Sequence, residues 1–180
     1  MSNYHRSTTS GATYFFTVVT YKRNPILCNP AIREALRKAI IKVKKQMPFT
    51  IEAWVLMPDH LHCIWTLPPK DNDYSKRWGL IKRAVSRSCK SFIAQVEHTT
   101  SGIKRHELAF WQRRFWEHQI RDKNDFNQHM DYIHHNPVKH GLCKTPSQWR
   151  WSTIHRYIKK GIYTYNWCMY DDSFNTLGEP

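Results

Sequence analysis

Two apolar segments separated by only a Pro-Asp pair constrain the fold more than any other feature of this sequence. Residues 49–57 (FTIEAWVLM) and 60–67 (HLHCIWTL) are rich in β-branched and aromatic side chains, which is typical of strands. Pro58 and Asp59 form a connection far too short for the crossover that parallel strands require. The two segments are therefore predicted to pair as an antiparallel hairpin.

The segments around this hairpin predict the rest of the element order. Residues 13–21 (TYFFTVVTY) are predicted to form the first strand, and residues 111–121 end in a fourth. Apolar side chains recur at helical spacing over residues 32–47 and 75–96, between these strands. Helices placed between strands, with one hairpin in the middle, are typical of the ferredoxin-like arrangement. We expect an α+β, ferredoxin-like fold, with a mostly antiparallel sheet of four to five strands and helices packed on one face.

A further helix is predicted after the fourth strand, from Asn124 as the N-cap to His135. The pair Asn136-Pro137 should end it, because the residue before a proline disfavours the helical conformation. We expect residues 1–170 to form a single domain and residues 171–180 to form an acidic C-terminal tail. The tail carries three acids and no Lys or Arg, and it is expected to be disordered or to lie in a basic groove as a mimic of nucleic acid.

The charge of the chain indicates a polyanionic partner. Lys and Arg number 28 against 14 Asp and Glu, so the formal net charge is +14. An excess of this size favours nucleic acid or an anionic membrane surface. Aromatic residues make up 14% of the chain and include eight Trp, which favours single-stranded nucleic acid because its bases stack on aromatic rings.

Several classes of protein are excluded by composition and pattern. The longest apolar run, from Ala53 to Met57, ends at Pro58 and is far below the roughly 18 residues of a membrane span. The first residues form no signal-peptide apolar core, which predicts a cytoplasmic location and no membrane partner. Five cysteines without a C-x-x-C pair argue against a zinc knuckle or a disulfide framework and favour reduced, structural thiols.

The first candidate for chemistry is the His60-Leu61-His62 triplet. Residues two apart on a strand point to the same face, so both imidazoles should project together while Leu61 faces the other way. Two imidazoles at this spacing can share a divalent cation, and the alternative is a pair of ordinary surface or core histidines. Their position at the start of an otherwise apolar strand favours the metal-binding interpretation, because solvated histidines have no obvious place there.

The second candidate is the pair Tyr132 and Asn136, which are four residues apart and would share one face of a helix. A phenol can attack phosphorus if it is exposed and its proton has an acceptor. An Asn carbonyl oxygen can complete a metal shell that already holds two imidazoles. The alternative is that Tyr132 is an ordinary aromatic of an amphipathic helix and Asn136 an ordinary helix terminator, and these residues alone leave both interpretations open.

Four separated blocks of the sequence, taken together, resemble one known family. The blocks are YFFT at 14–17, WVLMPDHLHCIW at 54–65, FWEHQIR at 115–121 and DYIHHNPVK at 131–139. They resemble, in the same order, the REP-associated tyrosine transposases, which are bacterial single-tyrosine members of the HUH (histidine, hydrophobic, histidine) nuclease superfamily. The resemblance extends from about Asn3 to Trp167.

The resemblance implies a ferredoxin-like enzyme that cleaves and joins DNA, and it implies roles for the candidate residues. Tyr132 matches the nucleophile, His60 and His62 match the metal-binding histidines, and Asn136 matches the third metal ligand. The implied cofactor is Mg²⁺ or Mn²⁺, and the implied intermediate is a 5′-phosphotyrosine. The implied substrate is single-stranded DNA with repetitive extragenic palindromic (REP) hairpins, acted on by a nucleoid-associated monomer or weak dimer.

Neighbouring side chains offer alternatives within this assignment. His135 and His129 lie within about one turn of Tyr132 and could replace Asn136 as a ligand. Asp59 or His118 could tune the metal or relay protons, although a structural role suits each of them better.

Basic residues are expected to contact phosphates, which positions a strand but carries little sequence information. Several lie on one side of the predicted helix at 75–96, as a stripe about four turns long, and Arg6 lies in an early segment that is a candidate for base contacts. The candidates are Arg6, Lys76, Arg83, Arg87, Lys90, Arg113 and Arg114.

Three other functions are weighed against the transposase. A non-catalytic regulator that binds single-stranded nucleic acid would need neither the histidine pair nor Tyr132. An RNA-binding module would present an aromatic platform where this strand presents histidines. A phosphoesterase that uses water would not need Tyr132.

Overall fold

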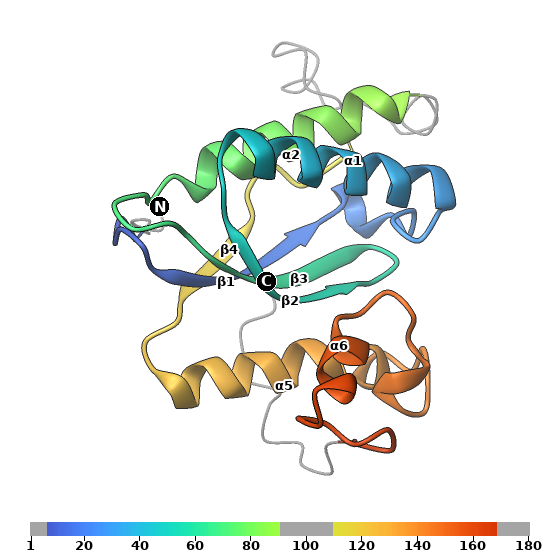
Figure 1. Cartoon of the computed structure of the whole chain (residues 1–180). Coiled ribbons are helices and arrows are strands. Elements are labelled where there is room, and N and C mark those ends of the chain that lie inside the picture. Colours follow the sequence, from blue (N-terminus) through green and yellow to red (C-terminus); the bar gives the residue numbers. More distant parts are fainter. Residues whose placement is uncertain (1–6, 91–109, 169–180) are drawn as a thin grey trace.

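The structure is a computed structural model, and it describes residues 7–90 and 110–168 (Figure 1). The elements follow the predicted order of strand, helix, strand, strand, helix, strand and helix, with two short 3₁₀ turns and a last helix, α6, in addition. The strands are β1 (Thr13–Val19), β2 (Thr50–Leu56), β3 (His60–Thr66) and β4 (Trp116–Gln119). The helices are α1 (Pro30–Gln46), α2 (Tyr74–Ser88), α5 (Lys123–Lys139) and α6 (Ile154–Lys159).

The strands form one antiparallel sheet in the order β2-β3-β1-β4. The predicted hairpin is confirmed, since Leu56 pairs with Leu61 across the Pro58-Asp59 turn. The other edge of β3 pairs with β1, from Thr13 opposite Thr66 to Val19 opposite His60. This topology confirms the α+β, ferredoxin-like class, with four strands.

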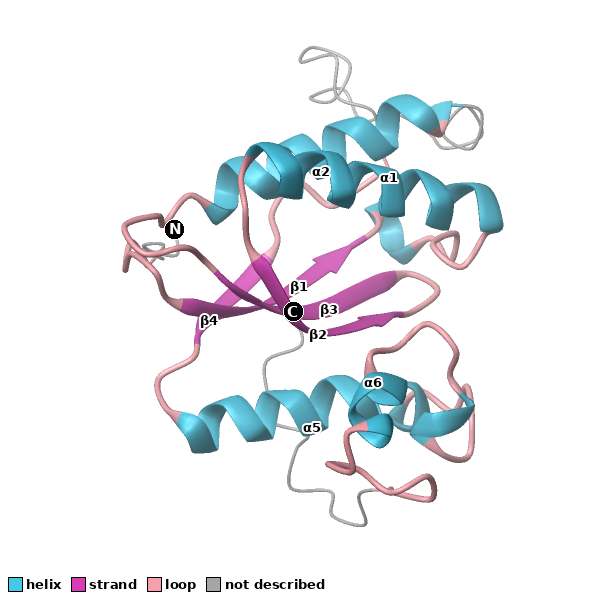
Figure 2. Ribbon diagram, viewed as in Figure 1, coloured by secondary structure: helices cyan, strands magenta, loops and turns pink. Residues whose placement is uncertain are grey.

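Helices cover both faces of the sheet, so the expectation that they pack on one face is wrong. Figure 2 shows α1 and α2 on one side and α5 with α6 on the other. The reason lies in the central strands: every residue of β3 except Thr66 is buried, so neither face of that strand is left to solvent. A strand that is apolar or buried on both sides needs a covering layer on each.

The face under α1 and α2 carries the larger core. Trp65 of β3 stacks on Trp78 of α2, with ring centroids 4.2 Å apart and planes 15° apart. Phe16 of β1 packs against both of these indoles. Leu61 and Cys63 belong to the same cluster, which places the odd-numbered positions of β3 on this face.

Helix α5 is longer than predicted at both ends. Its N-cap is Asp122, whose side chain accepts from the backbone N–H of Asp125, rather than Asn124. It continues through Asn136 and Pro137 to Lys139, so the prediction of an end at His135 is wrong. Pro137 removes one donor near the end of the helix, and its burial with Asn136 against the protein offsets that loss.

Several predictions lie outside the described residues. These are Arg6, the continuation of the second helix beyond residue 90, the loop at 99–107 and the acidic tail at 171–180. The division of the chain at residue 170 therefore stays a prediction. All five cysteines are free thiols in the structure. Within residues 7–90 and 110–168, no helix combines the length and the apolar character needed to cross a membrane.

Candidate active site

The histidine pair lies on the face of β3 that α5 covers. The side chains of His60 and His62 are 2% and 0% exposed, and their ring centroids are 4.8 Å apart. Ile64, two residues further along β3, belongs to the core cluster of this face, whereas Leu61 belongs to the opposite cluster. The strand alternation thus brings both imidazoles to one side, as the sequence predicts.

Each imidazole is oriented through its Nδ1 atom. The Nδ1 of His62 lies 2.9 Å from Oγ1 of Thr17 on β1, and the Nδ1 of His60 lies 2.6 Å from Oδ1 of Asp59. Burial raises the pKa of Asp59, but hydrogen bonds from His60 and Arg23 outweigh it and hold that pKa at about 2, so the carboxylate stays charged. Partners at Nδ1 fix the orientation of each ring and leave Nε2 as the nitrogen that could bind a metal, as in metal sites with a histidine held by a carboxylate.

Asn136 is brought to the histidine pair because α5 continues past the predicted end. Its side chain is 1% exposed, and its Oδ1 lies 3.4 Å from Nε2 of His60. Its Nδ2 atom is buried and has no hydrogen-bond partner among the described residues. Two imidazoles and an amide oxygen, without a thiolate, form a mixed nitrogen and oxygen donor set that fits a divalent cation such as Mn²⁺ or Mg²⁺.

Tyr132 lies one turn before Asn136 on the same face of α5. Its ring centroid is 5.2 Å from that of His62 and 5.9 Å from that of Phe15. The ammonium of Lys139 lies over the same ring, 5.2 Å from its centroid. The side chain is only 2% exposed. The structure therefore brings the predicted nucleophile beside the histidine pair, in a buried position.

The alternative ligand His129 belongs to a separate polar cluster that joins α5 to β4. Its Nδ1 lies 3.0 Å from Oδ1 of Asp125, whose Oδ2 lies 2.9 Å from Nε2 of His118 and 3.1 Å from Nε of Arg121. Burial raises the pKa of Asp125, but hydrogen bonds from His118 and Arg121 outweigh it and lower that pKa to about 2. The ligand atoms of His118, Asp125 and His129 lie within 4.8 Å of one another, a spacing that could also hold a metal ion.

Sequence reasoning missed Asp125 as the centre of this cluster. The one signal was the four-residue spacing of Asp125 and His129, which places both on one helix face. His118 is seven residues before Asp125 and on a strand, so only the packing of β4 against α5 brings it there. With its carboxylate shared by two imidazoles and a guanidinium, the cluster fastens the first turns of α5 to the sheet.

Three other histidines near Tyr132 and Asn136 lie in three different surroundings. His135, the second alternative ligand, lies with its Nε2 3.6 Å from Sγ of Cys168, in contact with that thiol. His134 is buried and bonds to Oγ1 of Thr153, and burial lowers its pKa to about 3. His140, which the sequence analysis did not single out, has its ring 5.3 Å from the ring of His60. Its spacing of four residues after Asn136 was the available signal.

The predicted phosphate-binding residues do not gather at the histidine pair. Helix α2 covers the sheet face opposite α5 (Figure 1). Residues of α2 pack in the core cluster of one face and Tyr132 in that of the other, so the basic residues of α2 lie across the sheet from Tyr132. Those that the structure describes are all exposed: Lys76, Arg83 and Arg87 from α2, Lys90 just after it, and Arg113 and Arg114 just before β4.

The chain was compared with known proteins and solved structures. A family model described as "Transposase IS200 like" matches residues 8–136. The chain is 45% identical to the REP-associated tyrosine transposase of Escherichia coli strain K12 over 167 residues. This aligned region covers 93% of this chain and 91% of that protein. A protein of Haemophilus influenzae is 38% identical over 171 residues, 93% of both chains. A solved structure of a REP-associated tyrosine transposase bound to a REP hairpin matches with a TM-score of 0.83 and 42% identity, over 100% of this chain and 98% of that one.

Proposed function

This chain belongs to the IS200-like transposases and, among them, to the REP-associated tyrosine transposases, and on that premise we propose that it cleaves and rejoins single-stranded DNA at REP-type hairpins. One observation carries the proposal: His60 and His62 from β3 and Tyr132 and Asn136 from α5 lie together, although His62 and Tyr132 are seventy residues apart in the sequence. Binding alone would need neither the phenol nor the histidine pair in this place.

Tyr132 is the nucleophile in this proposal. Its phenol oxygen attacks phosphorus, a new O–P bond forms, and the bond from phosphorus to the 3′ oxygen breaks. The products are a 5′-phosphotyrosine and a free 3′-hydroxyl, because the phenol loses its proton and the leaving oxygen gains one. A 3′-hydroxyl can then attack the phosphotyrosine and reverse the step, so the same residue supports cleavage and joining without a nucleotide cofactor.

His60, His62 and Asn136 would hold the divalent cation. A bound Mg²⁺ or Mn²⁺ supplies charge neutralisation at the scissile phosphate. Asp59 and Thr17 act through the two imidazoles, because each fixes the Nδ1 of one ring and with it the direction of Nε2. These two are positioning residues.

The burial of Tyr132 adds a requirement to the proposal. Tyr132 as a whole is 2% exposed, so its surroundings have to open before the phenol oxygen attacks a phosphate. Once it is uncovered, Lys139 places a positive charge beside the ring on which negative charge develops during attack.

The experiment is cleavage of a labelled single-stranded REP-type hairpin by the wild type and Tyr132→Phe, each with Mn²⁺ or with EDTA. We expect a metal-dependent product and a protein–DNA adduct that resists denaturation, both absent from Tyr132→Phe. The matched control is Tyr165→Phe, because Tyr165 is 66% exposed and outside the site, and this variant should cleave like the wild type.

The same experiment separates the other functions. Full cleavage by Tyr132→Phe without an adduct would replace the proposal with a phosphoesterase that uses water. Tight, salt-sensitive binding without cleavage, over several hairpins, would replace it with a non-catalytic regulator.

A further inference from the structure

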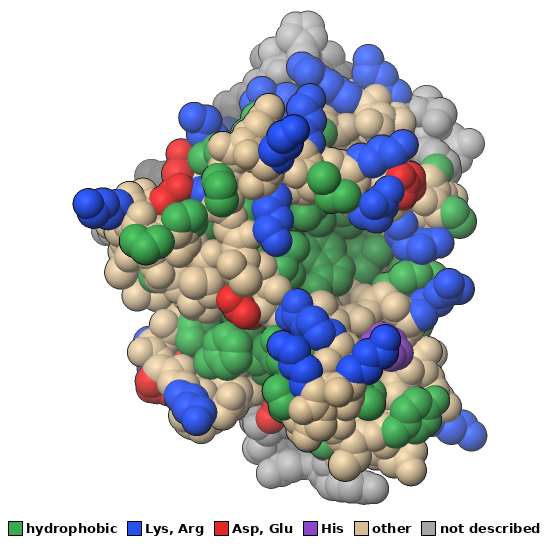
Figure 3. Space-filling model, in the orientation of Figure 1, with side chains coloured by type: hydrophobic (Ala, Val, Ile, Leu, Met, Phe, Trp, Pro, Cys, Tyr) green, Lys and Arg blue, Asp and Glu red, His purple; other side chains and the backbone are tan. Residues whose placement is uncertain are grey.

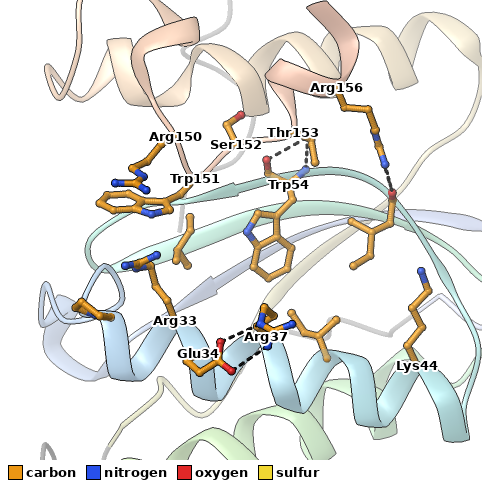
Figure 4. A pocket seen from close by; sticks show the side chains of 14 residues that line it. Arg33, Glu34, Arg37, Lys44, Trp54, Arg150, Trp151, Ser152, Thr153 and Arg156 are labelled. Carbon is orange, nitrogen blue, oxygen red and sulfur yellow. Dashed lines mark hydrogen bonds and ion pairs between the residues drawn. The ribbon is translucent and has the colours of Figure 1, made fainter. Parts of the chain in front are cut away.

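A groove of about 770 Å³ lies between α1 and the segment 150–156, along the edge of the sheet that β2 forms (Figure 4). We call it the β2-edge groove. Six of its lining residues matter for its chemistry: Arg33, Arg37 and Lys44 from α1, Trp54 from β2, and Arg150 and Trp151 from the last segment. It is separate from the histidine site, because Trp54 packs against the core cluster of the α1 and α2 face of the sheet.

The backbone edge of β2 is already covered inside this groove. The N–H of Leu56 donates to the carbonyl of Trp151, and the N–H of Thr153 donates to the carbonyl of Trp54, both at 2.9 Å. The guanidinium of Arg156 donates to the carbonyls of Ile51 and Glu52. An incoming strand would find these groups taken, which argues against a partner that adds a strand to the sheet. A ligand of the groove is recognised by side chains instead.

The charge of the groove is strongly positive. Five cationic side chains line it against one acid, Glu34, which leaves a net charge of +4. Figure 3 shows the result on the surface: a hydrophobic hollow with Lys and Arg side chains above and below it. Arg37 donates a hydrogen bond of 2.9 Å to the carboxylate of Glu34, and Arg156 donates to backbone carbonyls of β2. Both guanidinium groups therefore already have partners. Such a surface is complementary to a ligand with several negative charges.

Two of the cations remain available for such a ligand. Lys44 and Arg150 are exposed, and within residues 7–90 and 110–168 neither makes an ion pair or a side-chain hydrogen bond. They stand at opposite ends of the groove, with the indole of Trp54 between them (Figure 4).

The two indoles of the groove differ in their surroundings. Trp151 is packed between the guanidinium groups of Arg33 and Arg150, 5.0 and 5.9 Å from its ring centroid. Trp54 contacts no other aromatic ring in the part of the chain that the structure describes, and it points into the groove (Figure 4). An indole face that is not covered by another ring can stack on a nucleobase.

The groove adjoins a second cavity that lies on its side toward His140. This second cavity, of about 590 Å³, shares Arg150 and Trp151 with the groove and is also lined by Gly141. Gly141 follows His140, whose ring lies 5.3 Å from that of His60. A strand that leaves the histidine site past His140 would meet Arg150 and then Trp54.

We propose that the β2-edge groove binds an unpaired segment of the DNA strand, with phosphates on Lys44 and Arg150 and one base stacked on Trp54. The inference rests on the proposed function in taking DNA as the ligand, and it adds a binding surface away from the histidine site and from the basic side of α2. An unpaired strand fits better than a duplex, because a duplex hides its base faces and would leave the apolar floor without a partner.

The first test removes the two available cations. Lys44→Gln/Arg150→Gln is compared with Lys45→Gln/Lys159→Gln, which removes the same charge from exposed positions outside the groove, one of them on the same helix. All variants carry Tyr132→Phe, so that binding is measured without cleavage. The probes are a fluorescent REP-type hairpin with a single-stranded extension and the same hairpin without it, titrated by fluorescence anisotropy at several salt concentrations.

The groove variant should bind the extended hairpin about tenfold more weakly and lower the slope of log K against log salt by about 1.4, which is about 0.7 for each of two phosphate contacts on a single strand. The control variant should change affinity by less than about twofold, because its charges act only at a distance. If the groove variant lost the same affinity for both hairpins, the proposal would be overturned in favour of a contact with the duplex. If the groove and control variants lost the same affinity, it would be overturned in favour of nonspecific electrostatic attraction. If the wild type failed to cleave while the groove variant still bound the extended hairpin more weakly than the control variant did, the proposed function would be overturned and the groove proposal would stand.

The second test concerns stacking on Trp54. Trp54→Leu should weaken binding of the extended hairpin about tenfold, whereas Trp54→Phe, which keeps a ring face, should retain most of the affinity. Binding of the hairpin without an extension should be the same for both. Urea denaturation of both variants checks that each is folded at the temperature of the titration. Trp54→Leu binding the extended hairpin as tightly as Trp54→Phe would overturn the stacking contact.

Discussion

The two faces of the sheet bury side chains by different means. Under α1 and α2, residues such as Trp65, Trp78 and Phe16 fill the space with rings that contact one another. Under α5, the buried set includes His60, His62, His129, His134 and Asn136, among a smaller group of apolar residues. Both faces belong to the same two central strands, whose alternate residues point in opposite directions.

The difference teaches where this fold can place polar chemistry. A buried imidazole is tolerated only with a hydrogen-bond partner. On the α5 face, His62 finds its partner Thr17 on a neighbouring strand and His134 finds Thr153 just before α6, whereas His129 pairs with Asp125 one turn earlier on α5 itself. The face under α1 and α2 holds the larger apolar cluster, and the buried guanidinium of α2, Arg77, is paired with Asp71. The core thus stabilises the sheet from one side, while the other side holds the candidate catalytic groups.

The largest expected effect on stability comes from a substitution in the apolar core under α1 and α2. Trp65→Ala should lower the free energy of unfolding by about 3–5 kcal/mol, because it removes the indole stacked on Trp78 and leaves a cavity. Urea denaturation followed by far-UV circular dichroism measures it. Trp65→Phe, which keeps a ring in that space, should lose much less, and a loss below about 1 kcal/mol for Trp65→Ala would contradict this account of the apolar face.

A smaller effect is expected where α5 is fastened to β4. The folded pKa of Asp125, about 2, is below its ordinary value of 3.8, so its carboxylate stabilises the fold above about pH 4 and this contribution is lost as the pH falls toward 2. Asp125→Asn should lower the free energy of unfolding by about 2 kcal/mol at pH 7 and flatten its pH dependence between pH 4 and 2.

The control for Asp125 is an acid at the surface. An ion pair with Arg37 also holds the pKa of Glu34 at about 2, but this pair is exposed and screened by solvent. Glu34→Gln should therefore change stability far less than Asp125→Asn. If the two variants lost the same stability, burial of the α5 cluster would have no role.

A substitution beside the histidine pair should change the affinity for metal more than the stability of the fold. Thr17→Val keeps the side-chain volume and removes the hydrogen bond to Nδ1 of His62, so affinity for Mn²⁺ should fall by at least about tenfold. Titration calorimetry of the protein without DNA measures the affinity. Thr13→Val, which removes the hydrogen bond between Thr13 and Thr66 elsewhere on the sheet, is the matched control and should leave Mn²⁺ affinity unchanged. A normal affinity in Thr17→Val would contradict a positioning role for Thr17.

The smallest effect on stability is expected for the nucleophile. Tyr132→Phe keeps the ring that packs against Phe15 and His62, so the free energy of unfolding should change by no more than about 1 kcal/mol. Urea denaturation under the conditions of the cleavage assay measures this. A loss near that of Trp65→Ala would mean that absence of cleavage in Tyr132→Phe reports unfolding rather than chemistry.

The sequence predicts the parts of this fold that depend on neighbours along the chain. The two-residue turn at Pro58-Asp59 permits only a hairpin, and the alternation along β3 brings His60 and His62 to one face. The same local rules failed at Pro137. The preference against a helix before proline is modest, and burial of Asn136 and Pro137 against the sheet overrode it.

Other features depend on which elements pack together, and no spacing in the sequence could reveal them. His118 meets Asp125 because β4 lies beside α5, and Lys44, Trp54 and Arg150 border one groove although a hundred residues separate the first from the last. The need to cover both faces of β3 placed α5 opposite α1 and α2, which brought Tyr132 to the histidine pair and left the basic side chains of α2 on the other side of the sheet. The sequence by itself determined the element order, the hairpin and the identity of the candidate groups, because turns and periodicity act over a few residues. Only the tertiary structure decided which of those groups meet, because burial of apolar surface acts between elements that are distant in the chain.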